Sequence, residues 1–424
     1  MWSKKWSAVA AVAVVTVSIS ACGSKSTGSA GGATTLNVLS NWSGSSPERK
    51  ILGDVVASLK GQGITVNITE AGVTLPDIYE TSLVGGTEAD VVIANLAEKS
   101  NDWVKNGAAV SAAQYIDKWG LTDKIDPQAL KEWSGADGKA QGFPYAGFSW
   151  PVWYNTDLLK KAGVDRVPTT SDELITAAGK LRAAKIPPMI VGGSDWDGQK
   201  MFLQIAQSFM TPAETKTVYA KGGFCSNANA MKGIELFTKY RDSGVFVDST
   251  EGYSADQMNA AFYDGKAAMM SAGSWAFANA PASLVGHVTL GGLPVPTGSS
   301  YTKPTAYRGY TGAGFWISPN GDKKIDAAQK FITAFYGPAI VSRFATEANT
   351  VTAAKAGANA AITQPLMKAD VALGDTVDYA VMPDTVVPGD LAKPMIRQTS
   401  VAFSKGSDAK TICAAMDALY KNGG

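Results

Sequence analysis

The sequence is poor in the residues that most metal sites and imidazole-based catalytic sites require. Its 424 residues include one histidine, His287, and three cysteines. This scarcity disfavours zinc hydrolases and histidine-based catalysis. Charged residues make up 18% of the chain, and 38 basic side chains are balanced by 37 acidic ones. A nearly neutral chain has no basic field to hold a polyanion, so nucleic acid is not an expected partner.

Several enzyme motifs are also missing. The chain has no GxxxxGK[ST] phosphate loop, no HExxH and no GxSxG. We therefore expect no catalytic residue of these kinds, no bound cofactor and no metal. A secreted glycosidase needs only two carboxylates, and no pattern in a single sequence excludes such a pair. That enzyme therefore remains an alternative.

The first 35 residues have the composition of an export segment. Lys4 and Lys5 precede an apolar run over residues 8–19, which is shorter than the ~20 residues of a membrane-spanning helix. This pattern is typical of a signal peptide, here residues 1–21. The segment Ile19-Ser20-Ala21-Cys22 resembles the bacterial lipobox, in which the cysteine receives a diacylglycerol. We expect a lipid on Cys22, a flexible tether over residues 22–35, and a location outside the cytoplasm at the cell membrane. An ordinary secreted protein is the alternative.

Cys225 and Cys413 are the remaining cysteines. No CxxC motif or Cys/His cluster accompanies them, so a metal or redox site is not expected. Outside the cytoplasm the two thiols could form a disulfide. Two separately buried thiols remain an alternative.

The rest of the chain alternates between strand and helix patterns. Leu36–Leu39, Ile64–Ile68 and Asp90–Ala94 are predicted strands, and Ser46-Pro47 has the N-cap and first-turn residues of a helix. Thr170 and Glu173 form a predicted capping box. The alternation predicts an α/β fold with a parallel sheet. Because no flexible linker interrupts residues 36–424, two lobes would be joined by several crossings of the chain.

Tryptophans follow several predicted strands. Trp42, Trp196 and Trp275 lie in polar stretches that contain glycine or serine. In parallel α/β sheets, the loops after the strands line the ligand crevice. An indole face there can cover the apolar face of a sugar ring. The alternative for each tryptophan is a place in a lobe core.

Two blocks of sequence resemble a known family. Gln141–Tyr145 with Trp153–Gly163, and Ala260–Trp275, are similar to motifs of the extracellular solute-binding proteins of ABC importers, family 1, the maltose-binding-protein-like group. Pro168–Leu174 is also similar, although Ser171 replaces the usual tryptophan. The order and spacing agree over residues 36–424.

The resemblance implies a fold and a domain organisation. The fold is α/β, two-lobed and periplasmic-binding-protein-like (type II), with a ligand cleft between the lobes and a multi-strand hinge. The N-terminal lobe is expected over residues 36–148 and 298–340, and the C-terminal lobe over 149–297 and 341–424.

The resemblance also implies a function without catalysis. A monomeric lipoprotein would capture a neutral mono- or oligosaccharide and deliver it to the transmembrane subunits of an ABC permease. The implied ligand-binding residues lie on the loops and crossing segments beside the cleft: Trp42, Ser43, Asn95, Tyr145, Ser149, Trp150, Asp195, Trp196, Gly273, Trp275, Tyr310 and Gly312. The acidic residue of the maltose-binding pattern is missing near Phe148, which argues against maltose itself. A receptor for a polyol phosphodiester, or one that feeds a sensor kinase, are further alternatives.

Overall fold

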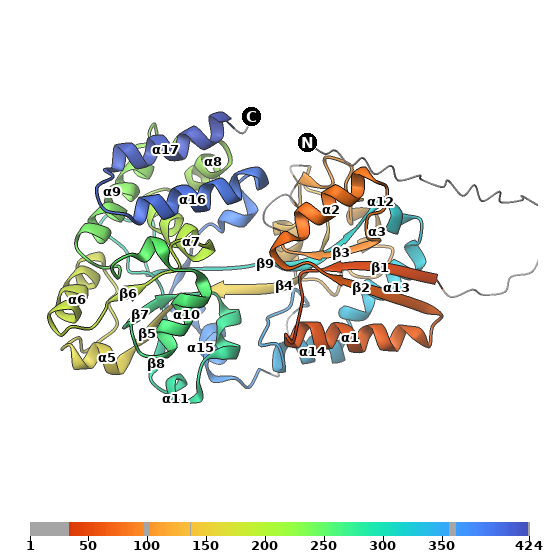
Figure 1. The fold of residues 1–424 in the computed structure, drawn as a ribbon, viewed down its shortest axis with the longest axis horizontal. Helices are drawn as coiled ribbons and strands as arrows, with labels where there is room; N and C mark the ends of the chain where they lie inside the picture. Colours follow the sequence, from red (N-terminus) through yellow and green to blue (C-terminus); the bar gives the residue numbers. More distant parts are fainter. Residues whose placement is uncertain (1–33, 97–99, 101, 136, 356–361, 423–424) are drawn as a thin grey trace, which may run out of the picture.

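The chain folds into two α/β lobes that lie side by side and are joined by long strands (Figure 1). The computed structural model describes residues 34–96, 100, 102–135, 137–355 and 362–422. The predicted signal peptide and the lipidation site at Cys22 lie outside the described residues.

The first lobe is built around a sheet in which β9 (Thr305–Ile317), β3, β1 and β2 lie in that order, and β4 (Phe143–Trp150) also pairs with β9. The short strand β10 (Asp378–Tyr379) pairs with the second-lobe end of β9, at Thr305 and Ala306. Strands β1 and β3 alternate between two cores: Val38 and Ile93 face one side, and Leu39 and Val92 face the other. A sheet buried on both faces explains why these strands read as continuous apolar runs. The elements of this lobe are β1 (Thr34–Ser40), α1 (Pro47–Lys60), β2 (Ile64–Glu70), α2 (Leu75–Val84), β3 (Val91–Ala94), α3 (Ala113–Ile116), α4 (Pro127–Glu132), α12 (Pro319–Asp322), α13 (Ile325–Phe335) and α14 (Pro338–Thr346).

The second lobe has a smaller sheet in the order β6-β7-β5-β8. Helices α7, α9, α16 and α17 pack together on it (Figure 1). Its elements are β5 (Val152–Asn155), α5 (Thr156–Lys161), α6 (Ser171–Ala183), β6 (Met189–Ile190), α7 (Trp196–Ala206), α8 (Pro212–Lys221), α9 (Ala228–Asp242), α10 (Ala255–Tyr263), β7 (Met269–Ser271), α11 (Ala282–Val285), β8 (Val288–Gly291), α15 (Pro365–Ala372), β10 (Asp378–Tyr379), α16 (Ala392–Phe403) and α17 (Ala409–Asn422).

Two antiparallel strands, β4 (Phe143–Trp150) and β9 (Thr305–Ile317), run from one lobe to the other. Their first-lobe ends pair Phe143 with Phe315, and their second-lobe ends pair Trp150 with Tyr307. The pairing shifts register between Pro144 and Phe148, as a β-bulge does. We call this pair the crossing ribbon.

The helix-capping residues predicted from the sequence at α1 and α6 do cap these helices. Ser46 caps α1, and its side chain accepts a hydrogen bond from the backbone N–H of Arg49. Thr170 and Glu173 form both bonds of the predicted capping box at α6. These motifs act over three or four residues, so they depend little on the rest of the fold.

The expected lobe boundary at residue 340 falls too early. Helix α14 packs on α1, and Phe344 lies in the core of the first lobe. The expected start of the returning segment, residue 298, is also too early, because Ser299 and Ser300 donate hydrogen bonds to Ser208 O in the second lobe. The chain therefore enters the first lobe along β9 itself.

A disulfide joins Cys225 to Cys413, with 5.1 Å between the Cα atoms. Beside it, the Asp417 carboxylate accepts hydrogen bonds from the backbone N–H groups of Gly223 and Phe224. Helix α17 is thereby attached to the loop that precedes α9. The alternative of two separate thiols is not what the structure contains.

Candidate ligand-binding cleft

One face of the crossing ribbon carries large aromatic side chains. Phe148 lies opposite Gly309, and Trp150 lies opposite Tyr307. Side chains of directly opposed residues share a face, and residues two apart along a strand do as well. Phe148, Trp150, Tyr307 and Gly309 therefore define one surface, which we call the aromatic face.

Trp275 packs on the aromatic face from the second lobe. Its ring centroid lies 5.4 Å from that of Phe148 and 5.1 Å from that of Trp150, with nearly perpendicular rings. The ring also lies over Gly273, where an added Cβ would be only 2.2 Å from it. Trp275 remains 47% exposed. One side of the indole is held in place while another stays open to a ligand.

Trp196 reaches the same region from the start of α7. It packs against the cluster that contains Trp150 and Tyr307. The preceding residue, Asp195, is the N-cap of α7 and accepts a hydrogen bond from Trp196 N at 2.8 Å. Asp195, a predicted ligand-binding residue, thus has a structural role as the cap of this helix.

A cavity of about 230 Å³ lies between Trp196 and loops of the first lobe. Its walls come from both lobes: Asn41, Gly72, Leu75, Pro76, Ala94, Asn95 and Trp196. Asn41 Oδ1 is buried and has no hydrogen-bond partner among the described residues. A buried acceptor of this kind is normally satisfied, so a polar ligand or water would complete it.

A buried ion pair borders the aromatic face. The Lys200 ammonium on α7 pairs with Asp384, and its Nζ lies 5.9 Å from the Trp150 ring centroid. Asp384 also accepts a hydrogen bond from Thr311 Oγ1 at 3.1 Å. Burial lowers the pKa of Lys200, and the charge of Asp384 opposes that effect. Nearby, burial raises the pKa of Asp197 to about 8, and the negative charge of Asp195 adds to it.

Glu132 brings a carboxylate to the same face. It is the last residue of α4, and its Oε2 accepts a hydrogen bond from Tyr310 N at 2.6 Å. The same oxygen lies 2.9 Å from where a Cβ of Gly309 would be. Gly309 and Phe148 share a face, so the carboxylate lies on the aromatic face. Burial raises the pKa of Glu132 above its usual range.

The structure brings together some of the residues that the sequence singles out and separates others. Trp150, Trp196, Gly273 and Trp275 meet at the aromatic face, and Asn95 lines the cavity beside it. Three more lie along the ribbon: Ser149, Tyr310 and Gly312. Ser149 N donates to Ser274 Oγ, and Tyr310 OH donates to Asp126. Gly312 leaves room for Phe148, whose ring would lie 3.1 Å from an added Cβ.

Trp42 and Tyr145 lie inside the first lobe, so the expectation of an indole face at the crevice is wrong for Trp42. Only 8% of Trp42 is exposed, and its ring contacts four other aromatic rings: Tyr145, Phe315, Phe335 and Phe344. Tyr145 is fully buried and donates a hydrogen bond to Phe335 O. Ser43 is exposed on the loop after Trp42. We leave Trp42 and Tyr145 out of the candidate site.

The sequence reasoning missed Glu132, Lys200 and Asp384. None of them follows a predicted strand closely, and each reaches the cleft through contacts with distant segments. The one local hint was Gly309, because a glycine in the middle of a strand often marks a close approach by another group.

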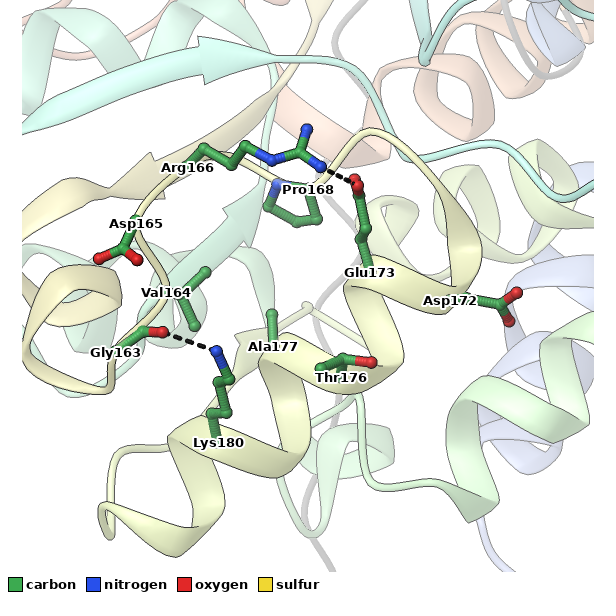
Figure 2. Close-up of a pocket in the computed structure, with 10 residues that line it drawn as sticks. All are labelled: Gly163, Val164, Asp165, Arg166, Pro168, Asp172, Glu173, Thr176, Ala177 and Lys180. Atoms are coloured by element: carbon green, nitrogen blue, oxygen red, sulfur yellow. Dashed lines mark hydrogen bonds and ion pairs between the residues drawn. The ribbon is translucent and has the colours of Figure 1, made fainter.

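A larger hollow of about 400 Å³ lies on the second lobe, between α6 and the loop before it (Figure 2). Its two cationic side chains are engaged locally: Arg166 pairs with Glu173, and Lys180 Nζ donates to Gly163 O at 2.8 Å. Its lining contains no aromatic residue. The cleft is therefore the better candidate, although this hollow is larger.

The part of the chain that the structure describes holds no group of three or more His, Cys, Asp or Glu residues arranged to bind a metal. Within the same residues, no helix has both the length and the apolar character needed to cross a membrane.

Comparison with known proteins gives consistent results. A family model described as bacterial extracellular solute-binding protein matches residues 54–341. A solved structure from Streptomyces coelicolor, a probable secreted solute-binding lipoprotein, is 39% identical and superposes with a TM-score of 0.80, covering 91% of this chain and 98% of the other. This similarity confirms the predicted two-lobed, type II periplasmic-binding-protein-like fold.

Curated relatives are matched over part of their length. A probable sugar-binding periplasmic protein from Rhizobium meliloti is 28% identical over 208 residues, which span 45% of this chain and 49% of the relative. An sn-glycerol-3-phosphate-binding periplasmic protein from Brucella abortus is 38% identical over 87 residues, 19% of this chain and 20% of the relative. The chain thus matches about half the length of the first relative or less, and the two relatives differ in the solute that they are named for.

Proposed function

The chain belongs to the family of bacterial extracellular solute-binding proteins, and we propose that it captures a neutral mono- or oligosaccharide for an ABC permease. In this proposal the protein is a monomeric receptor on the outer side of the cell membrane, and a lipid on Cys22 anchors it there. The Rhizobium meliloti relative, named as sugar-binding, supports the choice of ligand.

The observation that carries this proposal is the open indole of Trp275. Its ring is fixed by Phe148, Trp150 and Gly273, yet 47% of the residue stays exposed. An aromatic face held in this way suits the apolar C–H face of a pyranose. Mostly apolar walls with a few placed polar groups are what small-molecule sites usually offer.

Two polar groups, one beside the Trp275 indole and one in the cavity at Trp196, suit sugar hydroxyls. Trp150 Nε1 and Asn41 Oδ1 are buried without a partner among the described residues. A buried polar atom left unpaired costs about 1–3 kcal/mol. A ligand hydroxyl that pairs with either atom would remove that cost, and a solute without hydroxyls would not.

Closure of the two lobes is the proposed mechanism of capture. The cavity walls come from both lobes, so moving the lobes apart on the crossing ribbon would open it. A ligand that contacts both walls binds the closed form more tightly and shifts the population toward it.

Isothermal titration against neutral sugars tests the proposal. We expect at least one of glucose, galactose, cellobiose or N,N′-diacetylchitobiose to bind with micromolar affinity or better. Trp275→Ala should weaken that binding at least about fivefold, whereas Val401→Ala, which removes another exposed apolar side chain, should leave it unchanged. Tight binding of peptides alone would contradict the sugar assignment.

Incubation with a bound oligosaccharide separates a receptor from the glycosidase alternative. Glu132 and Asp384 both carry carboxylates to the ribbon, so the alternative has a specific pair to test. We expect the oligosaccharide to be recovered intact after prolonged incubation. Release of shorter sugars by the wild-type protein, but not by Glu132→Gln, would establish hydrolysis.

A further inference from the structure

We propose that Glu132 makes the cleft selective against anionic solutes, including sugar phosphates and polyol phosphodiesters. The inference rests on the proposed function, because it concerns the same cleft, and it goes further by assigning the charge selectivity to one side chain. The curated relatives are named for two kinds of solute, a sugar and sn-glycerol 3-phosphate. These solutes differ in charge, so the preference of the cleft for neutral or anionic solutes distinguishes between them.

Two cations near the aromatic face, among the residues that the structure describes, have acidic neighbours. Lys200 is buried and paired with Asp384. Arg308 lies next to Gly309 along β9, where its guanidinium contacts Asp370 and covers the Tyr379 ring at 4.8 Å. Lys200 is therefore committed to its carboxylate partner, and Arg308 is directed toward Asp370 and Tyr379.

Glu132, in contrast, has no cationic partner among the residues that the structure describes. Its hydrogen bonds come from Tyr310 N and from Gln128 Nε2 at 3.0 Å, and no lysine or arginine in the described part of the chain forms an ion pair with it. Asp126 and Asp384 lie close enough for their negative charges to disfavour its ionisation further. Asp384 is balanced by Lys200, so Glu132 and Asp126 are the acidic groups that make the field at this end of the aromatic face negative.

The Glu132 carboxylate lies on the same face as the aromatic rings on which a ligand would stack. Glu132 lies against Gly309, which is opposite Phe148, and Phe148 contacts Trp275. A sugar hydroxyl can donate a charge-assisted hydrogen bond to such a carboxylate. A phosphate in the same place would face a like charge in a partly buried site, where solvent screens it weakly. Gly309 is needed here because any side chain would displace the carboxylate.

Ligands that differ in charge provide the test. The mature protein is titrated against glucose, cellobiose and the other neutral sugars named above. It is also titrated against two anionic solutes, glucose 6-phosphate and sn-glycerol 3-phosphate. For the wild type we expect the best neutral sugar to bind at least 100-fold more tightly than either phosphate. Glu132→Gln should narrow that ratio at least tenfold. Glu132→Asp, which keeps the charge, should preserve it, and Glu235→Gln, at an exposed position on α9, is the matched control.

The outcomes separate this inference from the proposed function. If the wild type binds a neutral sugar and a phosphate equally well, or if folded Glu132→Gln keeps the full ratio, the inference is wrong and the sugar assignment stands. If the wild type binds a phosphate and no sugar, both are wrong. Melting curves show whether the variants are folded. Even if Glu132→Gln does not fold, equal affinity of the wild type for a neutral sugar and a phosphate would refute the proposed selectivity.

Discussion

Two clusters of aromatic residues in this protein are built from similar side chains but differ in what surrounds them. Around Trp42, four aromatic rings contact the indole and only 8% of the residue is exposed. Around Trp275, two rings hold one side of the indole, and 47% of the residue is exposed. Charged groups, among them Lys200 and Asp384, border the second cluster through Trp150.

The difference shows how a core aromatic and a binding aromatic can be told apart. A core ring is contacted from every direction, so its burial contributes to folding. A binding ring is fixed from one direction and leaves a face for a ligand, so its apolar area contributes only when the ligand arrives. Both tryptophans follow a strand, and position along the chain therefore does not distinguish them.

The largest expected effect is on the stability of the first lobe. Trp42→Ala should lower the free energy of unfolding by about 3–5 kcal/mol, because removing a fully packed aromatic side chain leaves a cavity. Urea unfolding followed by circular dichroism measures it, with Trp42→Phe as the milder control. A loss below about 1 kcal/mol would mean that the cluster is not a tightly packed core.

Trp275→Ala should give the opposite pattern. We expect sugar affinity to fall by about 1–3 kcal/mol, the value of one aromatic contact and its neighbouring hydrogen bonds. The free energy of unfolding without ligand should fall by no more than about 1–2 kcal/mol, because the ring is half exposed and packs against two other rings. Titration and urea unfolding of the same sample check both halves. If Trp275→Ala destabilises the protein as Trp42→Ala does, the contrast between the clusters fails.

The charges beside the second cluster should make stability depend on pH. The pKa of Asp197 is about 8 in the folded chain and about 3.9 in an unfolded one. Between these values the folded chain holds one more proton, so its stability falls as pH rises, by at most about 1.4 kcal/mol per unit. Asp197→Asn should remove this fall.

Urea unfolding at pH 5, 6, 7 and 8 tests that expectation. Asp326→Asn, at an exposed position on α13 in the first lobe, should behave like the wild type and serves as the control. Parallel curves for wild type and Asp197→Asn would show that burial does not perturb Asp197.

The smallest effect is expected at the rim of the cleft. Lys393 on α16 and Asp77 on α2 lie in different lobes, with 3.5 Å between Nζ and Oδ2, and both are about half exposed. An exposed pair contributes about 0.2–1 kcal/mol and is screened by salt. Lys393→Ala should therefore weaken sugar binding less than about fivefold at low salt and not at all at 1 M salt. An effect that persists at high salt would point to a different role for Lys393.

The parts of the fold set by short-range rules could be predicted from the sequence. Helix caps such as Ser46 and the box at Thr170 act within one turn, and the strands at Leu36 and Asp90 are apolar because both faces are buried. The two-lobed fold followed from these elements together with the family resemblance.

Side-chain direction at the cleft was harder to predict. Ser40 Oγ accepts a hydrogen bond from Trp42 N at 3.0 Å, which folds the end of β1 back and is consistent with the indole lying in the core. At Glu132, the decisive contact joins residues 178 positions apart. Neither the local turn nor the distant contact leaves a periodic pattern in the sequence.

The path between Cys225 and Cys413 has a consequence for the order in which the molecule can assemble. Both cysteines belong to the second lobe, but the chain between them follows β9 into the first lobe, forms α13 and α14, and returns. Helices α16 and α17, made last, cover α7 and α9. In a chain that emerges from an export channel, the apolar faces of α7 and α9 therefore stay uncovered until almost the last residues have emerged. The second lobe, which begins after the first, is also the last to be completed.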